Sequence, residues 1–317
     1  MYQANETRFG DNFAVLGSIP GSPAGNYTLR WLQRRKIWPS IEETATKIDS
    51  PVAYGTLLIR ILVRNNGSDL AQVREIINSC SLTKAEGWPR LIDNDTPPLS
   101  LTTFANISTA SVPVGLLELT ARTLDACPPF NVTNSASVVR ELEIAGLYGG
   151  SYHSPSNVNL TASTNDALAA LSASAASDFL ELNNGWVRLA LQGLYGNNYL
   201  ARAFVAATSY LALVESEVIY PSYSGANLSL ASGEAYLYTF STKPPLGTTG
   251  FWSLTMYNTE GFLVANPVNV YAIGDRSNLT YPDGSLVYGT ESSASHGSFQ
   301  VLIQSTATPP PANWTQK

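Results

Sequence analysis

The chain has 317 residues, of which 44% are hydrophobic and 13% charged, and its formal net charge is -6. This length can bury a substantial core and suggests about two domains. The acidic balance argues against a nucleic-acid partner, because phosphate binding requires clustered Lys and Arg. The sequence contains no uninterrupted apolar stretch of about 18 residues, so it predicts no transmembrane helix.

Sequons for N-linked glycosylation, N-x-S/T, recur along the whole chain. The composition would give roughly four or five by chance, and the excess favours a glycoprotein that is secreted or resides in the secretory pathway. The alternative is that a chain rich in Asn, Ser and Thr accumulates such triplets by accident. The ten positions are Asn5, Asn26, Asn66, Asn94, Asn106, Asn131, Asn159, Asn227, Asn278 and Asn313.

The chain has two cysteines, Cys80 and Cys127. In an oxidising compartment an even pair predicts one disulfide, whereas their wide spacing fits neither a CxxC redox motif nor a zinc site. The first ten residues lack the basic and apolar regions of a secretory signal, so we expect this sequence to be a mature or trimmed form.

The first third of the chain carries short apolar runs, such as 13–16 and 27–32, separated by turns rich in Pro and Gly. This alternation predicts an antiparallel sheet with loops. Residues 68–77 place apolar side chains at helical spacing behind an N-capping Ser or Asp, which predicts one short inserted helix.

From residue 164 to 218 the chain is rich in Ala and Leu with helical periodicity. This pattern predicts three helices, over 164–182, 186–195 and 199–214. After Pro221, dense aromatic and β-branched residues return between turn residues, which is typical of a β-sandwich or jelly roll. Strands are predicted at 235–240, 251–257 and 298–305.

An ordered series of short motifs in the second half resembles the paired DUF1254/DUF1214 family, as a fungal-type secreted member. The N-terminal half matches this family more weakly, through residues 12–14, 24–27 and Arg60, and Val270 stands where similar proteins usually have Arg. The motifs are Trp186, YGNNYLARA (195–203), YP (220–221), GEAY (233–236), Phe240, PP (244–245), FWSLTMY (251–257), LVANP (263–267), YAIGDRS (271–277) and DGSL (283–286).

The resemblance and the patterns together predict a β-rich α+β fold. Its parts are an N-terminal antiparallel, DUF1254-like β domain at 1–150, a helical connecting segment at 151–220 and a DUF1214-like, jelly-roll-like β-sandwich at 221–317. The family has no single established chemistry, so the resemblance implies a fold more than a function.

Several short motifs could carry chemistry. Gly149-Gly150-Ser151-Tyr152-His153 resembles a nucleophile elbow but lacks its last Gly, which favours a glycine-rich loop. Ser81-x-x-Lys84 matches a Ser/Lys pair that is common by chance. With two histidines, His153 and His296, we expect no metal, and no motif indicates a cofactor. We interpret three carboxylate pairs as solvated charge: Glu42/Glu43, Glu141/Glu143 and Glu215/Glu217.

Arg202, Asp275 and Arg276 are charged residues inside apolar segments. One interpretation is that they form buried ion pairs that join the helical segment to the C-terminal domain. The other is that they line an apolar pocket and orient the polar end of a ligand, because Arg presents a planar fork of donors. The candidate pocket consists of Arg202, Tyr257, Asn266, Tyr271, Asp275 and Arg276.

Two functions of different class follow from these observations. The first is an enzyme that needs neither metal nor nucleotide, such as an isomerase, cyclase or hydrolase, and acts on a hydrophobic small molecule. The second is a non-catalytic protein that binds a small molecule or lipid, or mediates assembly. The sequence does not decide between them, and a homo-oligomer stays open.

Overall fold

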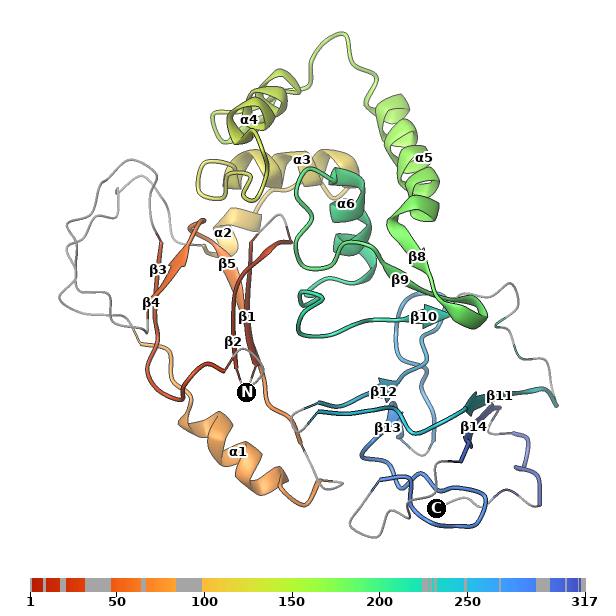
Figure 1. The fold of residues 1–317 in the computed structure, drawn as a ribbon. Coiled ribbons are helices and arrows are strands. Elements are labelled where there is room, and N and C mark those ends of the chain that lie inside the picture. The colour runs from red at the N-terminus through yellow and green to blue at the C-terminus, as the bar shows by residue number, and fades with distance from the viewer. Residues whose placement is uncertain are drawn as a thin grey trace. The chain divides into compact units, whose positions relative to one another are not determined.

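Figure 1 draws the computed structural model of the chain as a ribbon. The chain forms two compact units. Unit 1 comprises Met1–Arg60 and Leu82–Tyr223, and unit 2 comprises Ile61–Ser81 and Ser224–Lys317. The structure describes residues 2–7, 10–17, 21–31, 47–63, 67–83, 99–223, 228, 230, 233–247, 250–267, 269–288, 297–305, 307–312 and 314.

Unit 1 begins with a three-stranded antiparallel sheet. Its strands are β1 (Tyr2–Thr7), β2 (Asn12–Gly17) and β5 (Gly55–Arg60), in the order β2-β1-β5. This part of the predicted antiparallel sheet is confirmed. The neighbouring β3 (Thr28–Trp31) and β4 (Lys47–Ser50) instead pair in parallel, which the short apolar runs did not indicate.

Three helices then occupy a region that the sequence analysis assigned to the β-rich domain: α2 (Leu101–Phe104), α3 (Val112–Thr123) and α4 (Ser135–Ile144). Local signals for them exist. α3 carries a Pro in its first turn, where the absent N–H costs nothing, and the side chain of Asn134 caps α4 by accepting a hydrogen bond from Ser137 N at 3.2 Å. The carboxylate pair Glu141/Glu143 therefore lies on helix α4.

A small hairpin follows α4 and packs against α3 and α4. β6 (Leu147–Tyr148) and β7 (Ser151–Tyr152) are joined by Gly149 and Gly150, whose φ angles are 60° and 71°. Two consecutive positive φ values are what a two-residue turn of this kind requires. Ser151 thus sits in an exposed hairpin, not in the strand–turn–helix arrangement of a nucleophile elbow.

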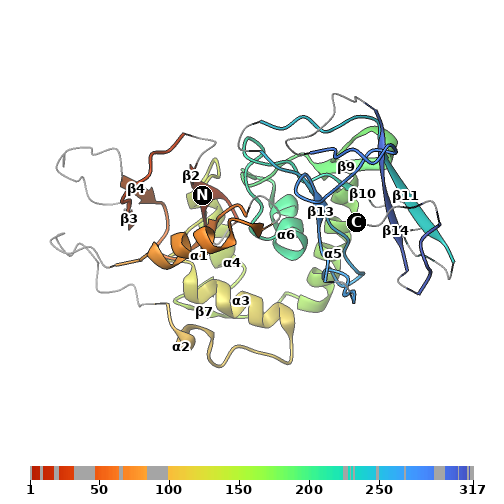
Figure 2. The same cartoon turned by 90° about the horizontal axis from the view of Figure 1, so that it is seen from below.

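The segment predicted as purely helical mixes helix and strand. The first predicted helix is confirmed as α5 (Leu160–Asp178), and the third is α6 (Tyr199–Thr208), which lies beside α5 (Figures 1 and 2). The second predicted helix is wrong. Its residues form β9 (Trp186–Leu189), which pairs with β8 (Phe179–Glu181) and β10 (Ser222–Tyr223) around the short helical turn Asn183–Gly185.

Two clusters of buried side chains form the core of unit 1. The first lies between β9 and α6, and consists of Leu189, Tyr195, Ala201, Val205 and Ala212, with Phe179 and Phe204 packed against it. The second consists of Val52, Ala126 and Cys127.

The predicted disulfide between Cys80 and Cys127 is wrong. Neither cysteine forms a disulfide in the structure. Cys127 is 1% exposed within its core cluster, and its thiol donates to the Tyr54 carbonyl oxygen at 3.4 Å. Cys80 is an exposed residue directly after helix α1 (Leu70–Ser79), which belongs to the other unit. The even number of cysteines predicted that the two residues pair with each other. In the structure Cys127 instead packs as a small apolar core residue.

Unit 2 combines α1 (Leu70–Ser79) with two antiparallel strand pairs. β11 (Ala235–Phe240) pairs with β14 (Phe299–Gln304), and β12 (Ser253–Leu254) pairs with β13 (Ile273–Gly274). The predicted helix and the first and third predicted strands are confirmed. The core contains Tyr281, Val287 and Phe299, with Phe240, Trp252, Leu279 and Tyr288 packed around it.

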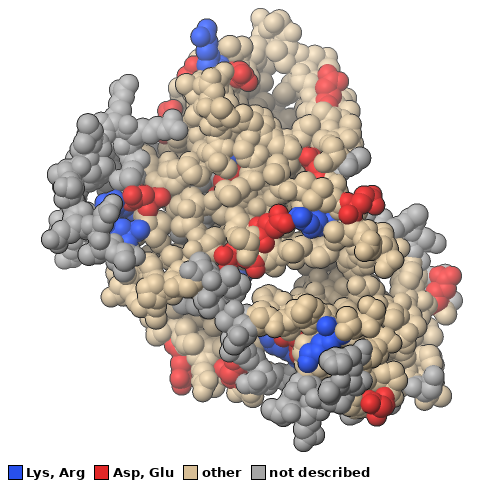
Figure 3. Space-filling view, viewed as in Figure 1, with Lys and Arg blue, Asp and Glu red and all other residues tan. Residues whose placement is uncertain are grey.

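The described part of the chain is therefore β-rich and contains six helices. Its strands form small sheets that are not closed. A jelly-roll-like sandwich stays a prediction. On the face drawn in Figure 3, charged side chains are few and lie scattered among uncharged ones. None of the helices described is long and apolar enough to cross a membrane.

The hairpin β6–β7 provides a test of this fold. Gly146 has φ +99°, and a Cβ on it would lie 2.0 Å from the His153 carbonyl oxygen, whereas a Cβ on Gly150, at φ +71°, would meet no atom within 4 Å. Gly150→Ala should cost about 1–2 kcal/mol from backbone strain alone. Gly146→Ala should lower the thermal unfolding midpoint clearly more, because backbone must also move. Equal midpoints for the two variants would contradict this hairpin geometry.

Candidate functional site

Arg202, the predicted site residue on α6, is buried in unit 1. Its guanidinium forms an ion pair with Asp11, and the exposed fractions of the two side chains are 6% and 0%. Nε and Nη2 also donate to the Gly196 carbonyl oxygen, at 3.1 and 2.6 Å. The guanidinium lies 5.7 Å from the centre of the Tyr195 ring. Arg202 therefore has fixed partners on several sides.

The Asp11 carboxylate is as fully bonded as its partner. Its Oδ1 accepts from Tyr195 N at 3.0 Å and from Asn131 Nδ2 at 3.2 Å, while Oδ2 faces Arg202. Burying a carboxylate is tolerable only when its oxygens keep such donors. These contacts join Asp11 to Tyr195, Arg202 and Asn131, and they leave no side of the ion pair open to a ligand.

The other five predicted pocket residues belong to unit 2. Asp275 Oδ1 accepts from Trp252 N at 2.9 Å, and its Oδ2 lies 3.7 Å from Arg276 Nε. The Arg276 guanidinium stacks 5.0 Å from the centre of the Phe251 ring. Asp275 therefore fixes the start of the β12–β13 pair.

The remaining predicted residues lie on an exposed loop. Asn266 closes it, since its amide donates to Val270 O at 3.0 Å and its Oδ1 accepts from Val270 N at 3.1 Å. Tyr257 and Tyr271 are 58% and 41% exposed. None of the six residues predicted from the sequence lines the pocket that the structure of unit 2 contains.

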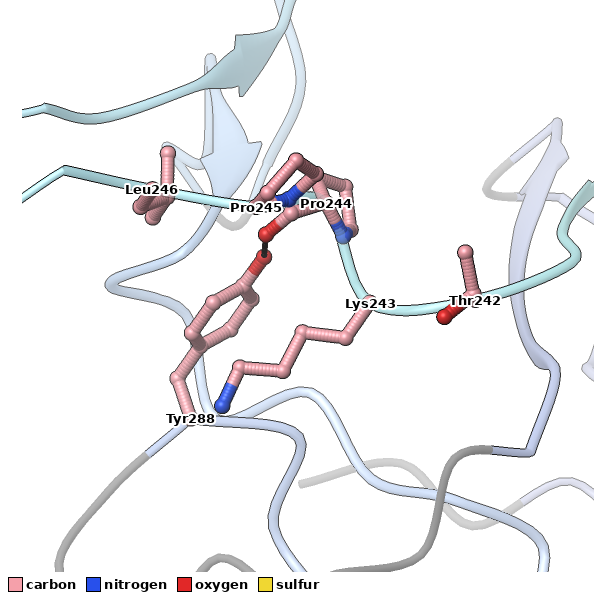
Figure 4. Close-up of a pocket in the computed structure, with 6 residues that line it drawn as sticks. All are labelled: Thr242, Lys243, Pro244, Pro245, Leu246 and Tyr288. Atoms are coloured by element: carbon pink, nitrogen blue, oxygen red, sulfur yellow. Dashed lines mark hydrogen bonds between the residues drawn. The ribbon is translucent and has the colours of Figure 1, made fainter.

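That pocket has a volume of about 380 Å³ and is open to solvent (Figure 4). One wall is the segment that follows β11, where two consecutive prolines restrict the backbone because each ring locks φ. The other wall is the side chain of Tyr288, which follows the buried Val287. The lining residues are Thr242, Lys243, Pro244, Pro245, Leu246 and Tyr288.

The hydroxyl of Tyr288 is held on both sides. It donates to the Pro244 carbonyl oxygen at 3.1 Å and accepts from Trp252 Nε1 at 2.8 Å. Burial, above all, raises the pKa of Tyr288, and the negative charge of Asp275 adds to the rise while the Trp252 hydrogen bond opposes it. The phenol is therefore neutral near pH 7, and it fixes the distance between the two walls.

Lys243 supplies the positive charge of the pocket. Its side chain runs beneath Tyr288 in Figure 4, and Nζ lies 4.8 Å from the centre of the ring. A cation over an aromatic face is attracted by the negative face of the ring. Lys243 forms no ion pair with any Asp or Glu among the described residues.

The lining of the pocket is suited to binding more than to proton transfer. The six described lining residues include no Asp, Glu, His or Cys, and the phenol already uses its proton and a lone pair within the protein. No group of three or more residues with metal-binding side chains occurs in the described part of the chain. The lining supplies one cation, one hydroxyl at Thr242 and several apolar surfaces.

The sequence analysis missed Lys243 and Tyr288. Pro244-Pro245 was part of the family resemblance, and a lysine directly before a rigid pair of prolines was a usable signal. Tyr288 could not have been assigned, because it lies 45 positions away and meets Lys243 only through the folding of unit 2.

The remaining sequence candidates that the structure describes do not form a second site. Glu215 pairs with Arg188 at 2.8 Å, and burial raises the pKa of the neighbouring Glu217, which is thus not simply a solvated charge. His153 stacks on the Tyr148 ring with a centroid distance of 4.4 Å. Glu42, Glu43, Lys84 and His296 lie outside the described residues.

The ion pair of Asp11 and Arg202 can be tested by removing one charge. Asp11→Asn keeps the shape of the side chain but leaves Arg202 buried without a carboxylate, so the free energy of unfolding should fall by about 3–5 kcal/mol. The control is Asp49→Asn, which breaks the exposed pair with Arg30 and should cost less than about 1 kcal/mol. Denaturant unfolding measures both, and similar losses would contradict the structural role given to Asp11.

Comparison with known proteins finds one family model that matches part of the chain. No curated protein matches it, and no solved structure does. Residues 218–317, which include the pocket, Trp252 and Asp275, match the model of the family DUF1214, described as a protein of unknown function.

Proposed function

We propose that unit 2 binds a hydrophobic small molecule in the pocket between Lys243 and Tyr288, and that its role is binding rather than catalysis. The observation that carries this proposal is the state of Tyr288. Its hydroxyl is saturated by Trp252 and Pro244, so the ring acts as a fixed wall and not as a general acid. The enzyme hypothesis finds no support in the side chains that line this pocket.

The construction of the pocket supports the same proposal. Two prolines and a doubly bonded tyrosine present apolar surfaces that lose little conformational freedom when a ligand binds, and preorganisation of this kind favours affinity. The volume of about 380 Å³ falls within the usual range of small-molecule sites. From the sequence resemblance we also propose that residues 1–150 form a DUF1254-like domain and that residues 221–317 have a jelly-roll-like topology.

Binding can be measured with the neutral hydrophobic fluorophore N-phenyl-1-naphthylamine. We expect a saturable rise in its fluorescence with the full chain, and at least about tenfold weaker binding for Leu246→Asp, because a carboxylate in the wall must be desolvated. The matched control is Leu237→Asp, which changes an exposed residue of β11 outside the pocket lining. Circular dichroism checks that both variants fold. Absence of saturable binding, or equal losses in both variants, would refute the proposal.

We also propose that the protein is a secreted glycoprotein. Glycan attachment requires an accessible Asn, and the five sequon residues whose side chains the structure describes are all exposed: Asn26, Asn106, Asn131, Asn159 and Asn278. For Asn5 the structure describes only the backbone, and Asn66, Asn94, Asn227 and Asn313 lie outside the described residues.

Site-resolved mass spectrometry tests the glycoprotein proposal. After expression in a eukaryotic host, enzymatic removal of glycans in heavy-oxygen water should convert each glycosylated Asn to labelled Asp, and we expect label at most of the five exposed sites. Asn269 is the internal control, since it is exposed but is not the Asn of an N-x-S/T sequon. Lack of label at all five sites would remove the argument for glycosylation and, with it, that for secretion.

A further inference from the structure

Lys243 differs from the paired basic residues of this protein. Four described arginines lie within 4 Å of a carboxylate: Arg30, Arg188, Arg202 and Arg276. Lys243 is half-buried and forms no ion pair with a described carboxylate, although the chain carries more acidic than basic residues. Its ammonium lies instead over the face of Tyr288.

The ring compensates the lysine only in part. A cation over an aromatic ring gains about 0.5–2 kcal/mol, depending on desolvation, and the ring occupies one side of an ammonium that has three N–H donors. The remaining donors need water or an acceptor. Among the described lining residues Lys243 is the one cation, and none of those residues carries a carboxylate.

The other polar groups of the pocket limit what a ligand can bond to. Tyr288 cannot offer its hydroxyl proton, because that proton is donated to Pro244 O. Trp252 Nε1 is likewise occupied by Tyr288. Polar recognition therefore falls to Lys243, with the Thr242 hydroxyl as a second donor, while Pro244, Pro245 and Leu246 supply apolar contact.

We infer that the ligand of this pocket is an anionic amphiphile, whose acidic group pairs with Lys243 while its apolar body lies against Pro244, Pro245 and Leu246. The acidic group is a carboxylate, sulfate or phosphate, since each offers oxygen acceptors and a negative charge to an ammonium. This inference rests on the proposed function, because it names the chemical class that the proposed binding site takes.

The test compares ligands that share a ten-carbon chain and differ in the head group. Decanoate, decyl phosphate, decanol and decylamine compete with N-phenyl-1-naphthylamine for the full chain, each below its critical micelle concentration. We expect the two anions to bind at least about tenfold more tightly than decanol, with decylamine weakest. Raising the salt concentration should narrow the gap between anion and alcohol, because screening weakens only the charged contact.

Variants assign the effect to one side chain. Lys243→Met should reduce the ratio of decanoate to decanol affinity to less than about threefold, and Lys243→Arg should restore most of it because the charge returns. Lys47→Met removes the same charge from β4 of unit 1 and should leave the ratio as in the unchanged protein. Circular dichroism and unfolding midpoints establish that the variants are folded.

The outcomes separate the two proposals. If the fluorophore shows no saturable binding to the full chain, the proposed binding function is wrong. If the fluorophore binds but decanoate and decanol compete equally, or if Lys243→Met leaves their ratio unchanged, the anionic class is wrong while the binding site stands. Tighter binding of decanoate than of decyl phosphate, or the reverse, identifies the preferred head group.

Discussion

The buried ion pair between Asp11 and Arg202 is the constraint around which unit 1 is arranged. It joins the residue just before β2 to helix α6, 191 positions later in the chain. Removing two charges from water is costly, and only a nearly complete set of donors and acceptors offsets this cost. The backbone of Tyr195 and the side chain of Asn131 supply donors to Asp11, so several distant segments must reach their places together.

The same region shows why α6 ends at Thr208 instead of continuing to residue 214 as the periodicity predicted. Leu211 has a φ of 69°, which costs a bulky residue free energy and cannot occur within a helix. Side chains from outside the segment hold its carbonyls in this conformation. Arg60 donates to Leu211 O at 3.0 Å, Asn12 to Ala212 O at 3.0 Å and Gln192 to Leu213 O at 2.7 Å. The periodicity of a segment contains no information about hydrogen-bond donors that lie far away in the sequence.

Prediction from the sequence succeeded where local pattern decides the structure. Helix α5 and strand β11 follow from composition and periodicity, and both form as expected. Strand β9 was predicted as helix because Trp186–Leu189 fits either period, and its pairing with β8 decides the outcome. Arg202 was predicted to join the helical segment to the C-terminal domain, whereas its ion pair is with Asp11 of unit 1. Pattern alone could not supply this partner, because Asp11 lies far away in sequence. The pocket was missed for the same reason.

The buried Arg202 of unit 1 has a carboxylate partner, whereas Lys243 in the pocket of unit 2 has none among the described residues. In unit 1 the buried charge of Arg202 is matched by Asp11 and by the Gly196 carbonyl oxygen, so the site is complete without a ligand. In unit 2 the polar groups behind the pocket are equally complete, since Asp275, Trp252 and Tyr288 satisfy one another or the backbone. That completeness makes the wall rigid, and in the proposed binding site it would leave the recognition of a ligand to Lys243, whose ammonium has a ring on one side and the open pocket beside it. We therefore propose that a rigid wall with a cation at its edge selects a ligand by its charge and its shape.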